Sequence, residues 1–433
     1  MRQIILFFLP LVSGNLFQQI YNLADSIIVG KIIGDNALAA VGATGTLHFL
    51  IFGFVIGMTR GYGILFSQSF GKKDAEVLKK YITASVHLSI VFSILFTLIC
   101  VTGLRTMLEF MNTPQDIIGD SYSYFIVIAA GIIVTVFNNL EIVILESMGN
   151  SKTPLIAMII SSVSNIVLDI VFVMGFKCGV AGAAIATVIA QFISYVLCHV
   201  RRVGISLSQD MASSEGRRTR LYIDLLRMGL PVALMNSITA AGGMVLQYFV
   251  NLMGSAYVAS YSVCMKYAGL FEQFGVSAGL AMLTFVGQNS GAGRYDRISK
   301  GVKSGLLLST VINVPIAFVQ IFCPGLLARL MLNDPVPIGY CEIFLPVLGI
   351  SFFPLGWLFI YRYSVQGLGN TFVPMLSGFL EVAMRFLIGM RLGRSSFRGV
   401  AIAEVSAWIG ACIMIGITYY AMMRRSESEG RVW

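Results

Sequence analysis

The sequence MGNSKTP, at residues 148–154, returns as LGNTFVP at residues 368–374. Two further pairs keep the same spacing of about 220 residues: Leu9-Pro10 with Leu230-Pro231, and SQSFGKKD at 67–74 with GQNSGAGR at 287–294. Three landmarks at one spacing are hard to obtain by chance. The chain is therefore predicted to be an internal duplication.

The composition places this duplication in a membrane. Of the 433 residues, 57% are apolar and 12% are charged, whereas a soluble protein carries about 25% charged residues. Apolar runs of span length recur from end to end and leave no loop with room for a catalytic domain. An enzyme is therefore not expected. The predicted spans cover residues 4–30, 43–68, 82–104, 121–147, 154–176, 181–203, 225–253, 257–287, 304–331, 338–365, 373–391 and 398–423.

Six spans per half give the two halves the same orientation. We expect an all-α integral membrane protein with twelve transmembrane helices in two six-helix lobes, related by a pseudo-two-fold axis along the membrane normal. The N-lobe would cover residues 1–203, a cytoplasmic linker residues 204–222 and the C-lobe residues 223–433. Two bundles that rock around a central ligand site are the usual machinery of alternating access.

Positive charges alternate between the loops. Lysines and arginines gather near residues 72–80, 152, 201–220, 294–303 and 424–425, and the opposite loops carry few cations apart from Arg391, Arg394 and Arg398. By the positive-inside rule both termini and the linker are cytoplasmic. The net charge of +9 is explained by this bias, so no nucleic-acid partner is expected. We expect a monomer in the cell (inner) membrane.

The halves differ where acidic residues lie inside predicted spans. Asp25 lies in the first span, and Asn165 and Asp169 are four residues apart on one face of the fifth. A carboxylate at the centre of a span costs at least about 2.5–3.5 kcal/mol on insertion scales. The matching positions of the second half hold Val245 or Leu246, Arg385 and Gly389. An acidic site in the first half alone is therefore predicted.

The chemistry of this acidic site suits a small cation. Two carboxylates, an Asn oxygen and the hydroxyl of Thr187 in the sixth span are hard ligands for Na⁺, or a group that shares a proton. The residues leave Na⁺ and H⁺ open as the coupling ion, and no other cofactor is expected. Two alternatives stay open. Asp25 lies near the outer end of its span, where water reaches it, and Glu404, near the position that matches Thr187, allows a second acidic site.

A substrate cavity is expected on the opening spans. The 21 methionines and 12% aromatic residues suit small amphipathic cationic drugs, because Met repacks without one fixed shape. Interhelical or lipid-facing packing is the alternative for each candidate. The candidates are Gln18, Asn139, Met235, Met244, Gln247, Tyr248 and Met265.

These features together resemble the multidrug and toxic compound extrusion (MATE) family, in particular its bacterial DinF- and MepA-like branch. The resemblance covers essentially the whole chain. It rests on the first-span proline with Tyr21-x-x-x-Asp25, Gly71–Asp74 (GKKD), GNSKTP at 149–154, Asn165-x-x-x-Asp169, the small-residue run at 182–187 and VGQNSGAG at 286–293.

The resemblance implies drug efflux in exchange for Na⁺ or H⁺. Its cation-binding residues would fall on Asp25, Asn165, Asp169 and Thr187, with Tyr21 close by, and its bending first-helix proline would be Pro10. Two rivals stay open. A flippase for a lipid-linked precursor would need a strongly cationic groove. A non-coupled channel or scaffold would have no need of paired carboxylates in one half only.

Overall fold

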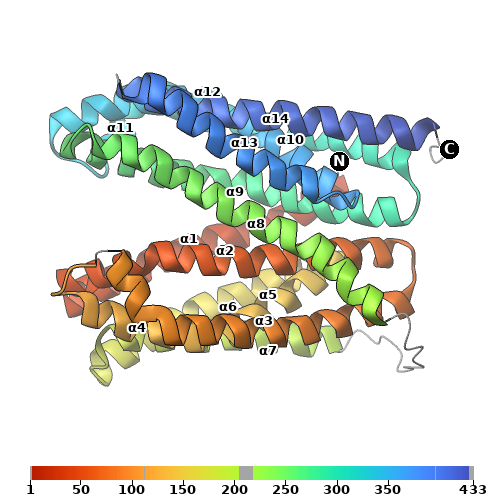
Figure 1. Cartoon of the computed structure of the whole chain (residues 1–433), viewed down its shortest axis with the longest axis horizontal. Helices are drawn as coiled ribbons and strands as arrows, with labels where there is room; N and C mark the ends of the chain where they lie inside the picture. The colour runs from red at the N-terminus through yellow and green to blue at the C-terminus, as the bar shows by residue number, and fades with distance from the viewer. Residues whose placement is uncertain (1, 112, 204–217, 395, 429–433) are drawn as a thin grey trace. The chain divides into compact units, whose positions relative to one another are not determined.

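A computed structural model describes residues 2–111, 113–203, 218–394 and 396–428. Within these ranges every regular element is a helix (Figure 1). The described residues contain 11 helices long and apolar enough to cross a membrane, and a bent pair makes a twelfth span when its two parts are taken as one. The prediction of an all-helical, multi-span membrane protein is confirmed.

Several helices are longer than the predicted spans, because charged residues such as Lys80 and Lys300 extend them beyond the apolar runs. The three η segments are π-helical turns. The first half contains α1 (Arg2–Ile28), η1 (Val29–Ile33), α2 (Asp35–Gly71), α3 (Ala75–Phe110), α4 (Ile118–Ala130), α5 (Ile132–Ser147), α6 (Lys152–Asp169), η2 (Ile170–Gly175) and α7 (Gly179–Val203). The second half contains α8 (Arg218–Asn251), α9 (Ser255–Gly291), α10 (Tyr295–Phe322), α11 (Pro324–Arg329), α12 (Pro335–Gly367), α13 (Phe372–Ile388), η4 (Gly389–Gly393) and α14 (Phe397–Ser428).

Two predicted spans are interrupted. The span predicted at 121–147 bends by 49° at Gly131, between α4 and α5. The span predicted at 304–331 is wrong at its end, because α10 stops at Phe322 and α11 starts at Pro324. Proline has no N–H and disfavours a helical conformation in the residue before it, so the chain leaves the helix at Cys323 and begins a new one.

The chain forms two compact units. The N-terminal unit consists of Ser13–Phe70 and Asp74–Gly229, and the C-terminal unit of Met1–Val12, Gly71–Lys73 and Leu230–Trp433. The units divide α1 and α8, because each of these helices contributes its first part to one unit and the remainder to the other, and the short segment Gly71–Lys73 also belongs to the C-terminal unit. Of the predicted linker 204–222, residues 204–217 lie outside the described residues.

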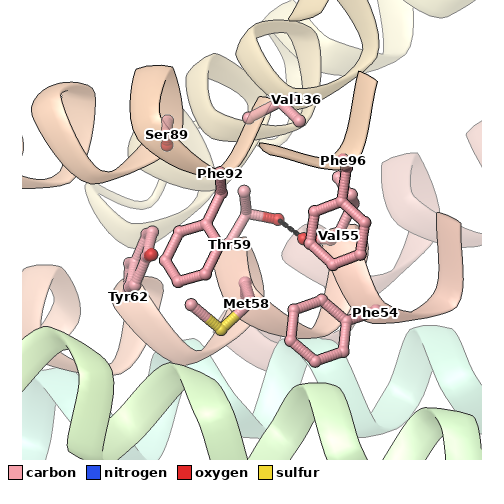
Figure 2. A pocket seen from close by; sticks show the side chains of 9 residues that line it. All are labelled: Phe54, Val55, Met58, Thr59, Tyr62, Ser89, Phe92, Phe96 and Val136. Atoms are coloured by element: carbon pink, nitrogen blue, oxygen red, sulfur yellow. Dashed lines mark hydrogen bonds between the residues drawn. The ribbon is translucent and has the colours of Figure 1, made fainter. Parts of the chain in front are cut away.

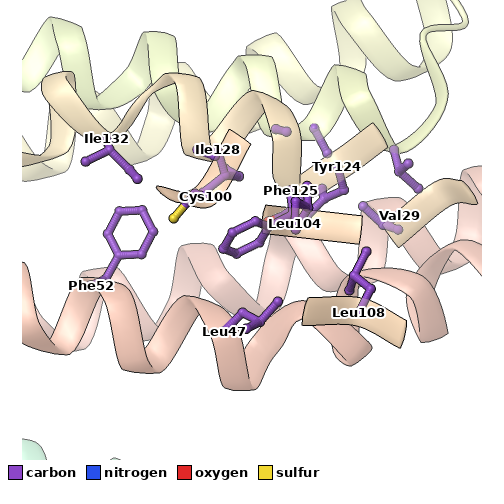
Figure 3. Packing of buried hydrophobic residues seen from close by; sticks show 14 of the residues in the cluster. Val29, Leu47, Phe52, Cys100, Leu104, Leu108, Tyr124, Phe125, Ile128 and Ile132 are labelled. Carbon is purple, nitrogen blue, oxygen red and sulfur yellow. The ribbon is translucent and has the colours of Figure 1, made fainter. Parts of the chain in front are cut away.

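In the N-terminal unit, α7 packs against α4, α5 and α6. Small buried residues such as Ala183 and Ala184 allow this close approach. An apolar core joins α2, α3, α4 and α5, and it also includes Val29 of η1 and Val173 of η2. Figure 3 shows the main members of this core: Leu47, Phe52, Cys100, Leu104, Leu108, Tyr124, Phe125, Ile128 and Ile132.

In the C-terminal unit, α12 packs against α9, α10 and α14, and α13 packs on α14. α12 is continuous although it contains Pro346 and Pro354. Its counterpart in the first half, the pair α4–α5, contains no proline and bends at Gly131 instead. The fourth span is therefore broken in the first half and continuous in the second.

Candidate cation site

Asp25 and Asp169 each lie close to a change of helix type. Asp25 is near the end of α1, and Asp169 is the last residue of α6. The π-helical turns η1 and η2 follow them, and these turns pack against each other and against α7. In η1 the N–H of Gly34 donates to the carbonyl of Val29 at 3.3 Å, the bond that a π-turn requires. Such turns are frequent at functional sites.

The carboxyl groups of Asp25 and Asp169 lie within hydrogen-bonding reach of each other. The side chain of Asp169 is fully buried. Both of its oxygens, and Oδ1 of Asp25, receive no hydrogen bond from an N–H or O–H group of the described residues. Two buried carboxylates at this distance repel each other unless a proton or a metal ion lies between them. The arrangement of the pair is therefore one that a proton or a metal ion would stabilise.

Asn165 of α6 and Thr187 of α7 are joined by a hydrogen bond one turn before Asp169. The Nδ2 of Asn165 donates to Oγ1 of Thr187 at 3.4 Å, and the Thr187 hydroxyl donates to the carbonyl of Ala183 at 3.0 Å. The buried Oδ1 of Asn165 meets no donor within the described chain. The amide N–H of Asn165 and the hydroxyl hydrogen of Thr187 are therefore already used in hydrogen bonds. The oxygen atoms of the two side chains keep lone pairs that can face a cation. Their chemistry fits Na⁺, or a network around a shared proton.

Two tyrosines lie beside the aspartate pair. Tyr21 is one turn before Asp25 on α1, hydrogen bonds to the side chain of Gln18, and is close enough to interact electrostatically with both aspartates. Tyr124 of α4, whose ring belongs to the core in Figure 3, interacts with both aspartates and with Tyr21. The sequence predicted Tyr21 and missed Tyr124, because a lone tyrosine in an apolar span gives no spacing signal.

Other buried acids of the N-terminal unit have basic partners. Glu146 of α5 forms an ion pair with Arg60 of α2. Glu141 accepts hydrogen bonds from Arg202 at 2.6 and 3.0 Å and lies 2.7 Å from Nδ1 of His199. Asp25 and Asp169 differ from these acids because no lysine or arginine of the described residues forms an ion pair with either of them.

The remaining predicted residues are distributed over both units. Pro10 lies inside α1, in the part that belongs to the C-terminal unit. Gln18 is exposed, and Asn139 donates to the carbonyl of Thr135 at 2.9 Å. Met235 is buried and contacts Gln366 through its sulfur. In the C-terminal unit Met244 and Tyr248 are exposed, and Gln247 and Met265 are partly exposed.

A model of the protein family called MatE matches residues 10–171 and matches again at residues 231–382. The two matches begin at Pro10 and Pro231, the prolines that mark the predicted duplication. The chain belongs to the MatE family. The first MatE segment contains Asp25, Asn165 and Asp169.

Relatives of this MatE chain include two proteins of Bacillus subtilis. "Probable multidrug resistance protein YoeA" is 28% identical over 336 residues, which is 76% of this chain and 73% of the relative. "Probable multidrug resistance protein YpnP" is 26% identical over 417 residues, which is 95% of this chain and 89% of the relative. A solved structure titled as the outward-facing conformation of a multidrug resistance MATE family transporter of the MOP superfamily has a TM-score of 0.90 at 21% identity and covers 98% of this chain and 96% of that one. The MatE fold therefore extends over the whole chain.

Proposed function

We propose that this MatE protein is a multidrug efflux antiporter of the cell membrane, which exports small amphipathic cationic compounds in exchange for Na⁺ or H⁺. The names of its relatives support drug export. The observation that carries the coupling is the pair Asp25 and Asp169, buried against each other without a donor from the described residues. A protein that only packs its helices gains nothing from such a pair.

In this proposal a cation from outside enters the N-terminal unit and lies between the two carboxyl groups. Its charge removes their repulsion, so α1 and α6 can approach near their ends. Oxygens of Asn165 and Thr187 complete the ligands for Na⁺, or form the hydrogen bonds of a protonated pair. Loading and unloading of this site change the charge inside the N-terminal unit.

The movement that follows is assigned to α1. Pro10 lacks an N–H and therefore weakens the helix at one point. A change in the attraction between α1 and α6 can bend α1 there at low cost. Bending would narrow the drug cavity, for which Gln18, Asn139, Met235, Met244, Gln247, Tyr248 and Met265 remain the predicted lining.

The driving force is sufficient for export. One charge that moves inward across 100 mV contributes about 2.3 kcal/mol. This corresponds to a concentration ratio of about 50 if the exported drug is neutral. For a monovalent cationic drug the electrical contributions cancel, and the chemical gradient of the coupling ion does the work.

The buried arginines argue against the alternative of a lipid-linked precursor flippase, because each of them already has an acidic partner. Arg60 pairs with Glu146, Arg362 with Glu381, and Arg385 with Glu404. These guanidinium groups are neutralised within the protein, whereas an anionic lipid headgroup would require cations that are free to bind it.

The decisive experiment measures efflux of a fluorescent drug in inside-out vesicles, with Na⁺ and pH gradients imposed separately. Transport driven by one gradient supports an antiporter and names the ion. Drug movement that needs neither gradient would indicate an uncoupled channel. Movement of a lipid-linked precursor without drug transport would indicate the flippase.

A further inference from the structure

The C-terminal unit contains a position-by-position counterpart of the cation site. The halves align at Pro10 and Pro231, at Asn150 and Asn370, and at the runs GAAIAT (182–187) and GVAIAE (399–404). Under this alignment every residue of the site is replaced. The counterparts are Gly242 for Tyr21, Leu246 for Asp25, Arg385 for Asn165, Gly389 for Asp169 and Glu404 for Thr187.

An ion pair replaces the hydrogen bond between the amide and the hydroxyl. In the N-terminal unit Asn165 donates to Thr187 at 3.4 Å. In the C-terminal unit Arg385 donates from Nε and Nη2 to the two oxygens of Glu404 at 2.8 and 2.9 Å. Arg385 and Glu404 are 3% and 4% exposed. A fixed positive charge thus lies where the first half leaves oxygen ligands available.

Two glycines, Gly242 and Gly389, leave space for the side chains of Arg385 and Phe249. A Cβ atom at Gly242 would lie 2.5 Å from Nη1 of Arg385, so the guanidinium occupies the space beside the residue that corresponds to Tyr21. A Cβ atom at Gly389 would lie 2.5 Å from the ring of Phe249, which fills the place of the Asp169 carboxylate. Leu246, the counterpart of Asp25, is fully buried. The C-terminal unit therefore has no counterpart of the Asp25 and Asp169 carboxylates. Arg385 and Phe249 occupy the space beside the corresponding positions.

The surrounding charges balance the guanidinium. Nη1 of Arg385 is 3.6 Å from Oε2 of Glu381, and Glu381 also pairs with Arg362 of α12. From α9, Glu272 and Tyr261 interact electrostatically with Arg385 and Glu404. These groups on α9, α12, α13 and α14 are the described charged and titratable groups that face Arg385.

We propose that Arg385 is a built-in cation that fills the C-terminal counterpart of the coupling site, so that only the N-terminal unit exchanges an ion. This inference rests on the function proposed for Asp25 and Asp169. It predicts that removal of the guanidinium exposes carboxylate oxygens that accept a mobile monovalent cation, with Na⁺ as the probe. The C-terminal unit then acts as a body of constant charge during transport.

The test uses the purified full-length protein in detergent, in an Asp169→Asn background that removes the proposed N-terminal site. Thermal unfolding is followed in sodium chloride and in choline chloride at equal ionic strength. Asp169→Asn alone is expected to unfold at the same temperature in both salts. With Arg385→Asn added, Na⁺ should raise the midpoint by several degrees, because it binds the folded state at Glu404. Arg385→Lys, which keeps a cation, should show no such rise.

A matched control distinguishes Na⁺ binding at this site from the effect of Na⁺ on any buried acid that has lost its basic partner. Arg60→Asn also leaves a buried acid, Glu146, without its partner, but at no counterpart of the cation site. The proposal would be overturned if Na⁺ raised the unfolding midpoint of Arg385→Asn by no more than it raises that of Arg60→Asn.

Arg385→Asn alone could fail to fold, because it leaves Glu404 without its partner. The double variant Arg385→Asn/Glu404→Thr addresses this case, because it replaces the ion pair with a copy of the neutral Asn165–Thr187 pair. If it folds while Arg385→Asn stays unfolded at every Na⁺ concentration, the vacated site accepts no mobile cation and the proposal is likewise wrong. None of these readouts measures transport. A wrong coupling assignment for Asp169 would instead appear as full efflux by Asp169→Asn.

Discussion

At the scale of single residues, the difference between the acids of the N-terminal unit lies in their partners. Glu141 and Glu146 are held by arginines, and a buried ion pair of this kind is costly to break but does not exchange ions. Asp25 and Asp169 lie against each other, and no lysine or arginine of the described residues forms an ion pair with either of them. A carboxyl pair without a fixed cation is the arrangement that responds to ion binding.

Replacement of Asp169 by Asn should therefore abolish gradient-driven efflux. The expected loss is about tenfold or more, equivalent to at least about 1.4 kcal/mol of cation affinity. Drug efflux from everted vesicles, at matched expression, measures it. Asp116→Asn, at an exposed position, is the control and should transport normally. Full efflux by Asp169→Asn would remove Asp169 from the coupling role.

At the scale of elements, breaks in the helices position the site. The π-helical turns η1 and η2 follow the two aspartates and pack together, and the bend at Gly131 separates α4, which holds Tyr124, from α5. None of these breaks coincides with a proline, so each depends on how neighbouring helices pack.

Gly131→Ala should destabilise the bend between α4 and α5. A Cβ atom there would lie 2.5 Å from Cγ2 of Val188, and an overpacked contact costs about 1–3 kcal/mol. The thermal unfolding midpoint should fall accordingly. Gly269→Ala, a helical position with open space around its Cβ, is the control and should leave the midpoint unchanged or raise it. Equal midpoints for the two variants would contradict the packing argument.

Pro10→Ala should slow transport more than it weakens drug binding, because a restored N–H stiffens α1 at the proposed bend. Initial efflux rates and equilibrium drug binding, measured on the same preparations, separate the two effects. Efflux at the wild-type rate would show that the bend at Pro10 is not a required step.

At the scale of the whole molecule, the charge bias of the loops predicts the orientation. Cys178 lies in the segment between η2 and α7 and is exposed, and the positive-inside rule places this segment outside. The other cysteines are buried, except for the partly exposed Cys323. Cys178 is therefore a reporter of topology that the chain already contains.

In a Cys323→Ser background, a membrane-impermeant maleimide added to intact cells should label Cys178, and Cys178→Ser should abolish the signal. Lys73→Cys, placed in the background that lacks both cysteines, should be labelled only after permeabilisation. The opposite pattern would invert the topology and place both termini outside.

The sequence alone was sufficient for the duplication, the helical class and the candidate acids. Apolar runs and repeated landmarks are read directly from the order of residues, and the burial cost of an acid depends on its own span. The end of α10 was missed, although Pro324 is a local signal, because apolar residues continue past it. The bend at Gly131 had no such signal.

Only the tertiary structure decided which side chains meet. The contact of Asp25 with Asp169, the place of Tyr124 and the π-helical turns depend on packing between segments far apart in the chain, which no spacing rule encodes. The same holds for Glu404. Its position in the sequence allowed a second acidic site. In the structure the guanidinium of Arg385, which lies beside Gly242, forms an ion pair with Glu404. Whether a buried acid is available to an ion is set by its partners in space, and sequence shows only its neighbours along the chain.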